Sequence, residues 1–190
     1  MNKKNLFTAF SIAVILCASL LKTSAQDFKT GDNVLSLGLG LGSAIGSSGY
    51  SSQSPGISLQ YEHGQWDVGG PGVISLGGYL GFKSFKYEYP PFYSEKWNYT
   101  VIGIRSAYHF SMVEVDHLDL YGGLMLSYNI LSTSRTVNDP LYNNFAETSA
   151  SGLWLSLYFG GRYYFSDNVG AFLELGYGIS YLSIGGQYKF

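Results

Sequence analysis

Few residues of this sequence could support catalysis or hold a metal ion, and histidine is the most versatile of these residue types. The chain has three histidines, His63, His109 and His117. Three imidazoles could bind a metal ion. These three, however, have neither helical nor Cys-x-x-Cys-type spacing, and turns commonly carry histidine for solubility. We therefore predict no metal site and no cofactor.

Charged residues form a clearer pattern, because those in the strand-like stretches share one face. Sorted by alternation, all seven fall on the polar face: Glu62, Lys83, Arg105, Asp119, Arg162, Glu174 and Lys189. Charges in a narrow interior are costly unless they pair. A tight turn at 166–168 would set Arg162 opposite Phe172 and diagonal to Glu174. We therefore expect an Arg162–Glu174 contact, with Lys189 nearby.

The elements that carry these charges are stretches in which apolar and polar residues alternate, as in half-buried β-strands. Eight such stretches follow residue 26, at 34–41, 56–62, 73–85, 99–110, 118–130, 153–165, 169–178 and 181–190. No long stretch there has helical periodicity. The sequence therefore predicts an all-β protein, an eight-stranded antiparallel up-and-down β-barrel.

Alternation alone leaves open which face is inside. A soluble lipocalin-like barrel would turn its apolar face inward around a ligand, and a transmembrane barrel would turn it toward lipid. The transmembrane reading is favoured because the apolar face is almost unbroken on every strand. The polar face is rich in glycine and serine, which suits a narrow lumen. We expect the lumen to be filled by Tyr79, Tyr121, Tyr158, Phe172 and Tyr181.

The composition agrees with a lipid-exposed surface and excludes some functions. Charged residues make up 13% of the chain, about half the share in a typical soluble domain. Hydrophobic residues make up 46% and aromatic residues 17%. Because 11 basic residues face 13 acidic ones, the chain has no basic surface for a nucleic acid.

The first 25 residues have the pattern of a secretory signal peptide. Lys3 and Lys4 precede an apolar stretch that is shorter than the roughly 20 residues of a spanning helix. Small residues at 23–25 predict cleavage between Ala25 and Gln26. We expect residues 26–190 to form one barrel domain, without a cysteine and hence without a disulfide.

The connections between the predicted strands alternate in length. If both ends of the chain lie in the periplasm, the long connections 42–55, 86–98 and 131–152 lie outside the cell. The connection 86–98 is the best candidate for a surface contact, through Tyr87, Tyr89, Phe92, Tyr93 and Trp97, since tyrosine and tryptophan are enriched in interfaces. The alternative is an aromatic girdle at the lipid headgroups.

The C-terminal residues resemble the assembly signal of outer-membrane β-barrels, with Leu182, Ile184, Tyr188 and the terminal Phe190 on one face. Residues 160–172 are also similar to the penultimate hairpin of small barrels in the outer-membrane-protein β-barrel domain family. The resemblance implies a bacterial outer-membrane location, with membrane lipid and lipopolysaccharide around a monomer. It also implies contact with the secretion and barrel-assembly machinery during biogenesis.

Family membership implies no reaction, so the functional prediction remains coarse: a structural or surface-interaction role without catalysis. One alternative is a narrow pore or a passage for small hydrophobic molecules. A second is an envelope enzyme, because His109-Phe110-Ser111 resembles the His-x-Ser of outer-membrane lipid A deacylases, in which the histidine is the base and the serine the nucleophile. Asp119 is the nearest following acid.

Overall fold

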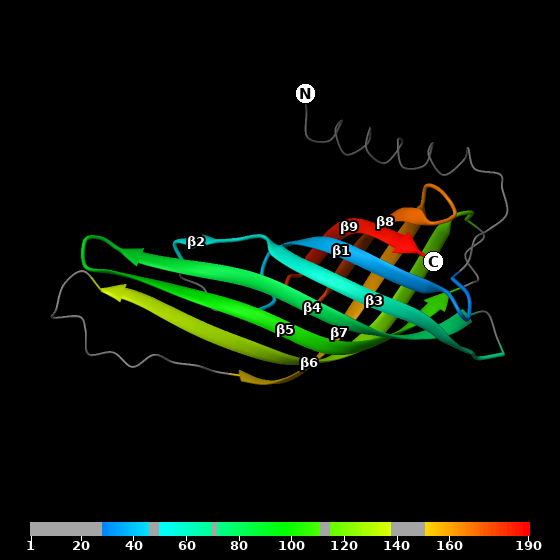
Figure 1. The fold of residues 1–190 in the computed structure, drawn as a ribbon, viewed down its shortest axis with the longest axis horizontal. Helices are drawn as coiled ribbons and strands as arrows, with labels where there is room; N and C mark the ends of the chain where they lie inside the picture. Colours follow the sequence, from blue (N-terminus) through cyan, green and yellow to red (C-terminus); the bar gives the residue numbers. More distant parts are fainter. Residues whose placement is uncertain (1–27, 46–49, 70–71, 111–114, 138–150) are drawn as a thin grey trace, which may run out of the picture.

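Antiparallel pairing between chain neighbours closes eight strands into a ring. The structure is a computed structural model that describes residues 28–45, 50–69, 72–110, 115–137 and 151–190. The strands are β1 (Asn33–Leu41), β2 (Ser52–Gln53), β3 (Gly56–Asp67), β4 (Gly72–Tyr89), β5 (Tyr93–Phe110), β6 (Leu118–Val137), β7 (Ser151–Tyr164), β8 (Val169–Gly176) and β9 (Leu182–Lys189). β9 pairs with β1, and the short β2 only adds to the edge of β4 (Figure 1).

The stagger of the ring follows from the strand registers. From Leu37, the ladders through β3, β4, β5 and β6 lead to Leu153 on β7. The ladders through β9 and β8 lead to Tyr163, ten residues further along the same strand. An eight-stranded barrel with such a shear has an interior that its own side chains fill.

The burial pattern confirms the predicted fold and the assignment of its two faces. All seven charged side chains on the polar face are buried inside the barrel. The apolar side chains point outward, as shown by Leu37, Ile104 and Leu155, which are 60%, 64% and 65% exposed. This is the reverse of a soluble ligand-binding barrel.

Four of the five predicted lumen fillers, Tyr79, Tyr121, Tyr158 and Phe172, are buried. The prediction for Tyr181 is wrong, since its side chain is 50% exposed. Residues 177–181 form a bend rather than strand, and β9 begins only at Leu182. The bend turns Ile179 and Ser180 inward and breaks the alternation on which the prediction relied.

Strand length differs greatly around the ring. β4 and β5 have 18 residues each and β6 has 20, whereas β8 and β9 have eight each. Figure 1 shows the long strands projecting beyond the rest of the ring at one end, here called the loop end. The predicted connection 86–98 is therefore mostly strand, closed by a turn at 89–93, because alternation and pairing continue past the apolar run. The described residues contain no helix long and apolar enough to cross a membrane.

The opposite end, here called the terminal end, holds both chain termini of the described barrel. Asn33 and Phe190 exchange backbone hydrogen bonds of 3.1 and 2.9 Å there. The short turn at 166–168 lies at the same end and sets Arg162 opposite Phe172, as predicted. The predicted cleavage site at Ala25 and Gln26 lies outside the described residues.

The outward face leads to a prediction for folding in lipid. Leu157 pairs with Leu124 near the middle of the ring, and both are about half exposed. Replacing Leu157 by Arg would put a charge into hydrocarbon, so we expect Leu157→Arg to lower the free energy of folding into lipid vesicles by about 2–4 kcal/mol.

Val169→Arg is the matched control, because Val169 is also outward-facing but lies beside the turn at 166–168. It should cost only about 0–1 kcal/mol, as expected near the interface. Urea titrations of folding into vesicles would measure both values. Equal costs for the two variants would contradict the assigned membrane face.

Candidate functional site

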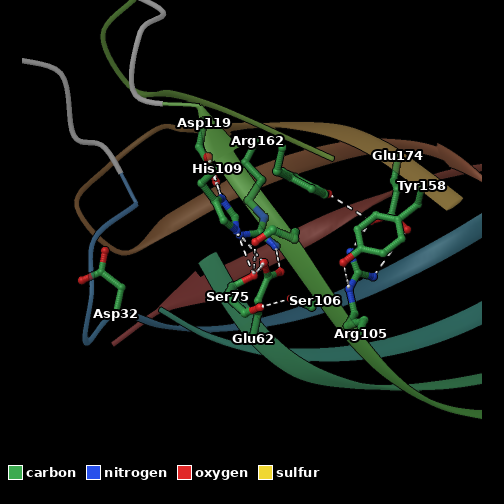
Figure 2. A network of polar contacts seen from close by, with 12 residues as sticks. Asp32, Glu62, Ser75, Arg105, Ser106, His109, Asp119, Tyr158, Arg162 and Glu174 are labelled. Atoms are coloured by element: carbon green, nitrogen blue, oxygen red, sulfur yellow. Dashed lines mark hydrogen bonds and ion pairs between the residues drawn. The ribbon is translucent and has the colours of Figure 1, made fainter. Parts of the chain in front are cut away.

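A cluster of buried charged groups lies inside the barrel between its middle and the terminal end. The lumen cluster consists of Glu62, Arg105, His109, Asp119, Arg162 and Glu174, which come from five different strands (Figure 2). It forms two halves, each centred on one arginine.

The half nearer the terminal end is centred on Arg162. Its guanidinium forms an ion pair with Glu62 through Nη2 and lies 3.4 Å from Asp119 Oδ2 through Nη1. His109 bridges the same two acids, with Nδ1 2.8 Å from Asp119 Oδ1 and Nε2 2.6 Å from Glu62 Oε1. The Ser75 hydroxyl donates to Glu62 Oε1 at 2.6 Å. Each carboxylate therefore has at least two partners.

The other half is centred on Arg105. Its Nη2 donates to Glu174 Oε2 at 2.7 Å, and its Nε donates to the Tyr158 hydroxyl at 3.2 Å. The Tyr121 hydroxyl donates to the same Glu174 oxygen at 3.1 Å. The Tyr121 ring also lies 4.4 Å from Arg162 Cζ, so this side chain connects the two halves. Such charge-assisted bonds are shorter and stronger than neutral ones.

The histidine completes the charge balance of the cluster. Only a protonated imidazole can donate at both ring nitrogens, and here each nitrogen lies close to a carboxylate oxygen. With His109 protonated, three positive groups face three carboxylates. A balanced cluster avoids the free-energy cost of an uncompensated charge in a dry interior.

Ser75, His109 and Asp119 are hydrogen-bonded in the same order as the catalytic triad of a serine hydrolase. Ser75 Oγ lies 3.1 Å from His109 Nε2, and His109 Nδ1 lies 2.8 Å from Asp119. Ser75 is nevertheless fully buried, and the shortest hydrogen bond of its hydroxyl is the one that it donates to Glu62. A nucleophile must be reachable by a substrate, and this buried serine is not.

A short segment before β1 closes the lumen at the terminal end. The Phe28 ring stacks on the His109 imidazole with centroids 4.0 Å apart, and it is 2% exposed. Gly31 N donates to Gly64 O at 2.8 Å, and Gly64 N donates to Asp32 O at 2.9 Å. A Cβ at position 64 would collide with the Lys29 carbonyl, so glycine permits this close approach. Residues 28–32 therefore form a strap across the end of the barrel.

The structure places the remaining lumen charges at the two ends. Lys189 Nζ lies 3.8 Å from Asp32 Oδ2 in the strap, and Lys83 donates to the Gly42 carbonyl near the loop end. The predicted Arg162–Glu174 contact is wrong. Glu174 pairs with Arg105 instead, because side chains reach across the narrow lumen and not only to neighbouring strands.

Sequence reasoning missed His109 as a member of the lumen cluster, and Ser75 and Phe28 as side chains that contact it. Alternation along β5 gives His109 the same parity as Arg105, so that signal was available. Ser111 of the His-x-Ser motif lies outside the described residues. His63 bonds to Asn33 and His117 packs on Tyr163, so the three histidines lie apart. Among the described residues, no group of three His, Cys, Asp or Glu is arranged to hold a metal ion.

A second candidate site lies on the projecting part of β4, β5 and β6. The side chains that continue the lumen-facing parity there include four aromatic residues beside Glu95 and Arg135, and we call Tyr87, Tyr89, Tyr93 and Trp97 the outer aromatic face. Ring centroids of Tyr87 and Tyr89 lie 6.2 and 5.7 Å from that of Tyr93, and Arg135 Cζ lies 4.3 Å from the Tyr93 ring. Phe92 stacks on Tyr89 at the turn, with centroids 5.5 Å apart.

The opposite face of the same sheet is polar. It carries Lys86, Glu88, Lys96 and several serines, and Lys86 pairs with Glu88. A girdle residue has to point toward lipid, but the outer aromatic face continues the lumen-facing side. The parity of these strands therefore disfavours the girdle interpretation of Tyr87 to Trp97.

The C-terminal signal residues lie on the outward face of β9. Ile184 and Tyr188 are 50% and 52% exposed, and Phe190, which follows β9, is 60% exposed. Leu182 lies on the same face and is partly buried. The structure thus leaves this row of apolar side chains available at the surface of the barrel.

Comparison with solved structures finds the same fold in two bacterial proteins. One is Ail, the attachment invasion locus protein of Yersinia pestis, crystallised with the heparin analogue sucrose octasulfate. It is 16% identical, with 85% of this chain and 99% of Ail covered and a TM-score of 0.55. The other is the N-terminal β-barrel domain of Pseudomonas aeruginosa OprF, 13% identical, with 86% of this chain and 100% of that domain covered and a TM-score of 0.51.

These identities are low, and the likeness is one of fold. The fold is that of small outer-membrane β-barrels. No protein-family model matches the sequence, and no curated protein matches it.

The geometry of the lumen cluster predicts a non-additive effect of mutations. Arg105→Met would leave Glu174 buried without its arginine, and Glu174→Met would do the reverse. Each single variant should cost about 3–5 kcal/mol of stability, because an uncompensated charge remains buried. The double variant should cost less than either single one. Denaturant unfolding in lipid vesicles, analysed as a double-mutant cycle, measures the coupling, and additive costs would contradict the pairing.

Proposed function

We propose that this chain is an integral protein of the bacterial outer membrane whose closed barrel carries a surface for contacts outside the cell. We further propose that residues 1–25 are a signal peptide removed before Gln26, and that the mature chain acts as a monomer. The observation that carries the proposal is the combination of a closed, charge-paired lumen with the projecting outer aromatic face.

Aromatic side chains support the membrane position. Each strand that runs toward the terminal end finishes with an outward-facing aromatic residue: Trp66 at β3, Phe110 at β5, Phe165 after β7 and Phe190 after β9. Tyr177 and Tyr181 are exposed toward the loop end. Aromatic rings at both edges of an outward apolar band are typical of transmembrane barrels. Lipid and lipopolysaccharide would cover this band.

Strand length supports the orientation. Outer-membrane barrels have short periplasmic turns and longer extracellular connections. The turn at 166–168 and both described termini lie at the terminal end, and β4, β5 and β6 project at the loop end (Figure 1). In this orientation the strap faces the periplasm and the outer aromatic face lies outside the cell.

The closed lumen argues against a pore. The interior is occupied by the lumen cluster, by the rings of Tyr79, Tyr121, Tyr158 and Phe172, and by the strap. Catalysis is not proposed either, because the serine of the triad-like arrangement is buried.

The outer aromatic face is suited to binding because its rings are large, rigid and amphipathic. Tyr89 is 47% exposed. Ail was crystallised with a sulfated sugar, but the described part of the projecting sheet has Lys86, Lys96 and Arg135 against Glu88 and Glu95. This near balance favours a partner with little net charge over a polyanion.

An adhesion assay with two matched triple variants tests the contact surface. Tyr87→Ser/Tyr89→Ser/Tyr93→Ser removes rings from the aromatic side, and Lys86→Ser/Glu88→Ser/Lys96→Ser alters the polar side of the same strands. Vesicles carrying each protein would be tested on immobilised neutral glycans and matrix proteins. The aromatic variant should bind at least about tenfold more weakly, since buried rings dominate interface energy. Binding that is absent in the unaltered protein, or lost equally in both variants, would overturn the proposal.

Planar-bilayer recordings test the closed lumen separately. We expect the purified protein to give no steady conductance, because its interior side chains leave no continuous aqueous path. A large, weakly selective and lasting current would refute this part of the proposal. It would favour the alternative of a narrow pore.

A further inference from the structure

A cavity of ≈ 440 Å³ lies at the loop end of the barrel, separate from the lumen cluster. Its lining includes Ile45, Tyr99, Asn129, Ser151, Gly152 and Trp154. A buried cluster that contains Tyr79, Val101, Met125 and Ile179 lies beneath, and Ile45 and Tyr99 pack against it. The cavity therefore does not continue into the lumen, and its size is typical of a small-molecule site.

The registers place the key side chains on one face. Asn129 on β6 is opposite Val101 on β5 and Gly152 on β7. Tyr99 lies two residues along β5 from Val101, and Trp154 two residues along β7 from Gly152, so all of them share the inward-facing parity. Asn129 thus lies between a phenol ring on one neighbouring strand and an indole ring on the other.

Trp154 is unusual among the tryptophans of the chain. Trp66 is 51% exposed on the lipid-facing side near the terminal end, where a girdle accounts for it. Trp154 is 54% exposed, but its position on β7 points into the mouth of the barrel. Neither core packing nor a girdle explains an exposed indole there, whereas a ligand that stacks on it would.

The lining also indicates the chemistry of that ligand. The described residues that line the cavity carry no charge. Two aromatic rings offer stacking surfaces. Asn129 Oδ1 accepts from Ser127 at 3.4 Å, while its amide nitrogen has no partner among the described residues and can donate. A neutral pyranose ring, with an apolar C–H face and hydroxyls at its edge, fits this combination.

We propose that this cavity, the mouth site, binds a single neutral pyranose unit at the end of a glycan. The sugar stacks on Trp154, lies against Tyr99 and forms hydrogen bonds with the Asn129 amide. Two sources present the same chemistry, namely a sugar of lipopolysaccharide in the same membrane and a glycan on another surface. The site does not depend on the outer aromatic face, so the two proposals can fail independently.

Binding can be measured with methyl β-D-glucopyranoside, methyl β-D-galactopyranoside and methyl α-D-mannopyranoside added to the mature protein in phosphatidylcholine nanodiscs. Saturation-transfer NMR should detect saturable binding of at least one of them. N-acetylneuraminic acid and octanol should bind no better than to empty nanodiscs. No saturable binding of any neutral pyranoside, or stronger binding of octanol, would overturn the proposal.

Gly152 provides a sharp variant, because a Cβ at this position would meet nothing within 4 Å. Gly152→Leu should therefore fold and fill the mouth site. This variant and Trp154→Ala should each weaken binding at least about fivefold. Trp66→Ala is the matched control, with a similarly exposed indole at the other end, and should bind as the unaltered protein does. Unchanged binding in folded Gly152→Leu would refute the location.

A measurement on the unaltered protein guards against variants that fail to fold. The bound sugar should slow oxidation of Trp154 by N-bromosuccinimide, read by mass spectrometry, and leave the oxidation of Trp66 and Trp97 unchanged. Equal oxidation of Trp154 with and without saturating sugar would contradict the stacking.

A last comparison distinguishes the two sources. Lipopolysaccharide in the nanodisc should protect Trp154 and exclude the methyl glycoside if the sugar comes from the same membrane. If it has no such effect, and a soluble oligosaccharide still protects Trp154, the glycan comes from another surface. Either result supports a pyranose site, and failure of both sources to protect Trp154 overturns it.

Discussion

The structure depends on the requirement that charges inside a narrow, dry barrel be paired. An isolated charge there would cost several kcal/mol, so Arg105 and Arg162 need carboxylates within hydrogen-bond reach. Their closest carboxylates come from strands that are distant in the ring, since Arg162 on β7 pairs with Glu62 on β3 and Arg105 on β5 with Glu174 on β8. These contacts bind opposite walls together. The same side chains fill the cross-section, so the barrel is at once braced and closed.

Much of this arrangement follows from alternation alone. The two faces, the burial of the seven charges and the pairing of Arg162 with Phe172 across the hairpin could be predicted, because each depends on the two-residue period of a strand or on one tight turn. The partner of Glu174 could not, because cross-lumen contacts depend on the stagger with which the ring closes. The stagger depends on the registers of all eight strand pairs, so it cannot be predicted from any single hairpin.

Two other errors have local causes. Extending the alternation of the last strand backward places Tyr181 in the lumen, but the bend at 177–181 changes which side chains face inward. Hydrophobic alternation alone predicts loops where the structure has the projecting sheet. Tyr87, Tyr89 and Tyr93 do alternate with polar residues, but around Pro90 and Pro91 the pattern reads equally well as a loop. Ser75, His109 and Asp119 have the geometry of a triad, but the serine is buried. Here this geometry belongs to a structural ion-pair arrangement.

The uninterrupted length of β4, β5 and β6 has a mechanical consequence. Eighteen residues of extended strand span about 60 Å, and the residues of the tip share their strands with Arg105, His109 and Asp119 of the lumen cluster. A pull on the tip along the strand direction would load the β4–β5 and β5–β6 ladders in shear, so that many backbone hydrogen bonds resist together. The strands would transmit the force to the ion pairs buried inside the barrel. The projecting sheet is therefore mechanically continuous with the ion pairs inside the barrel.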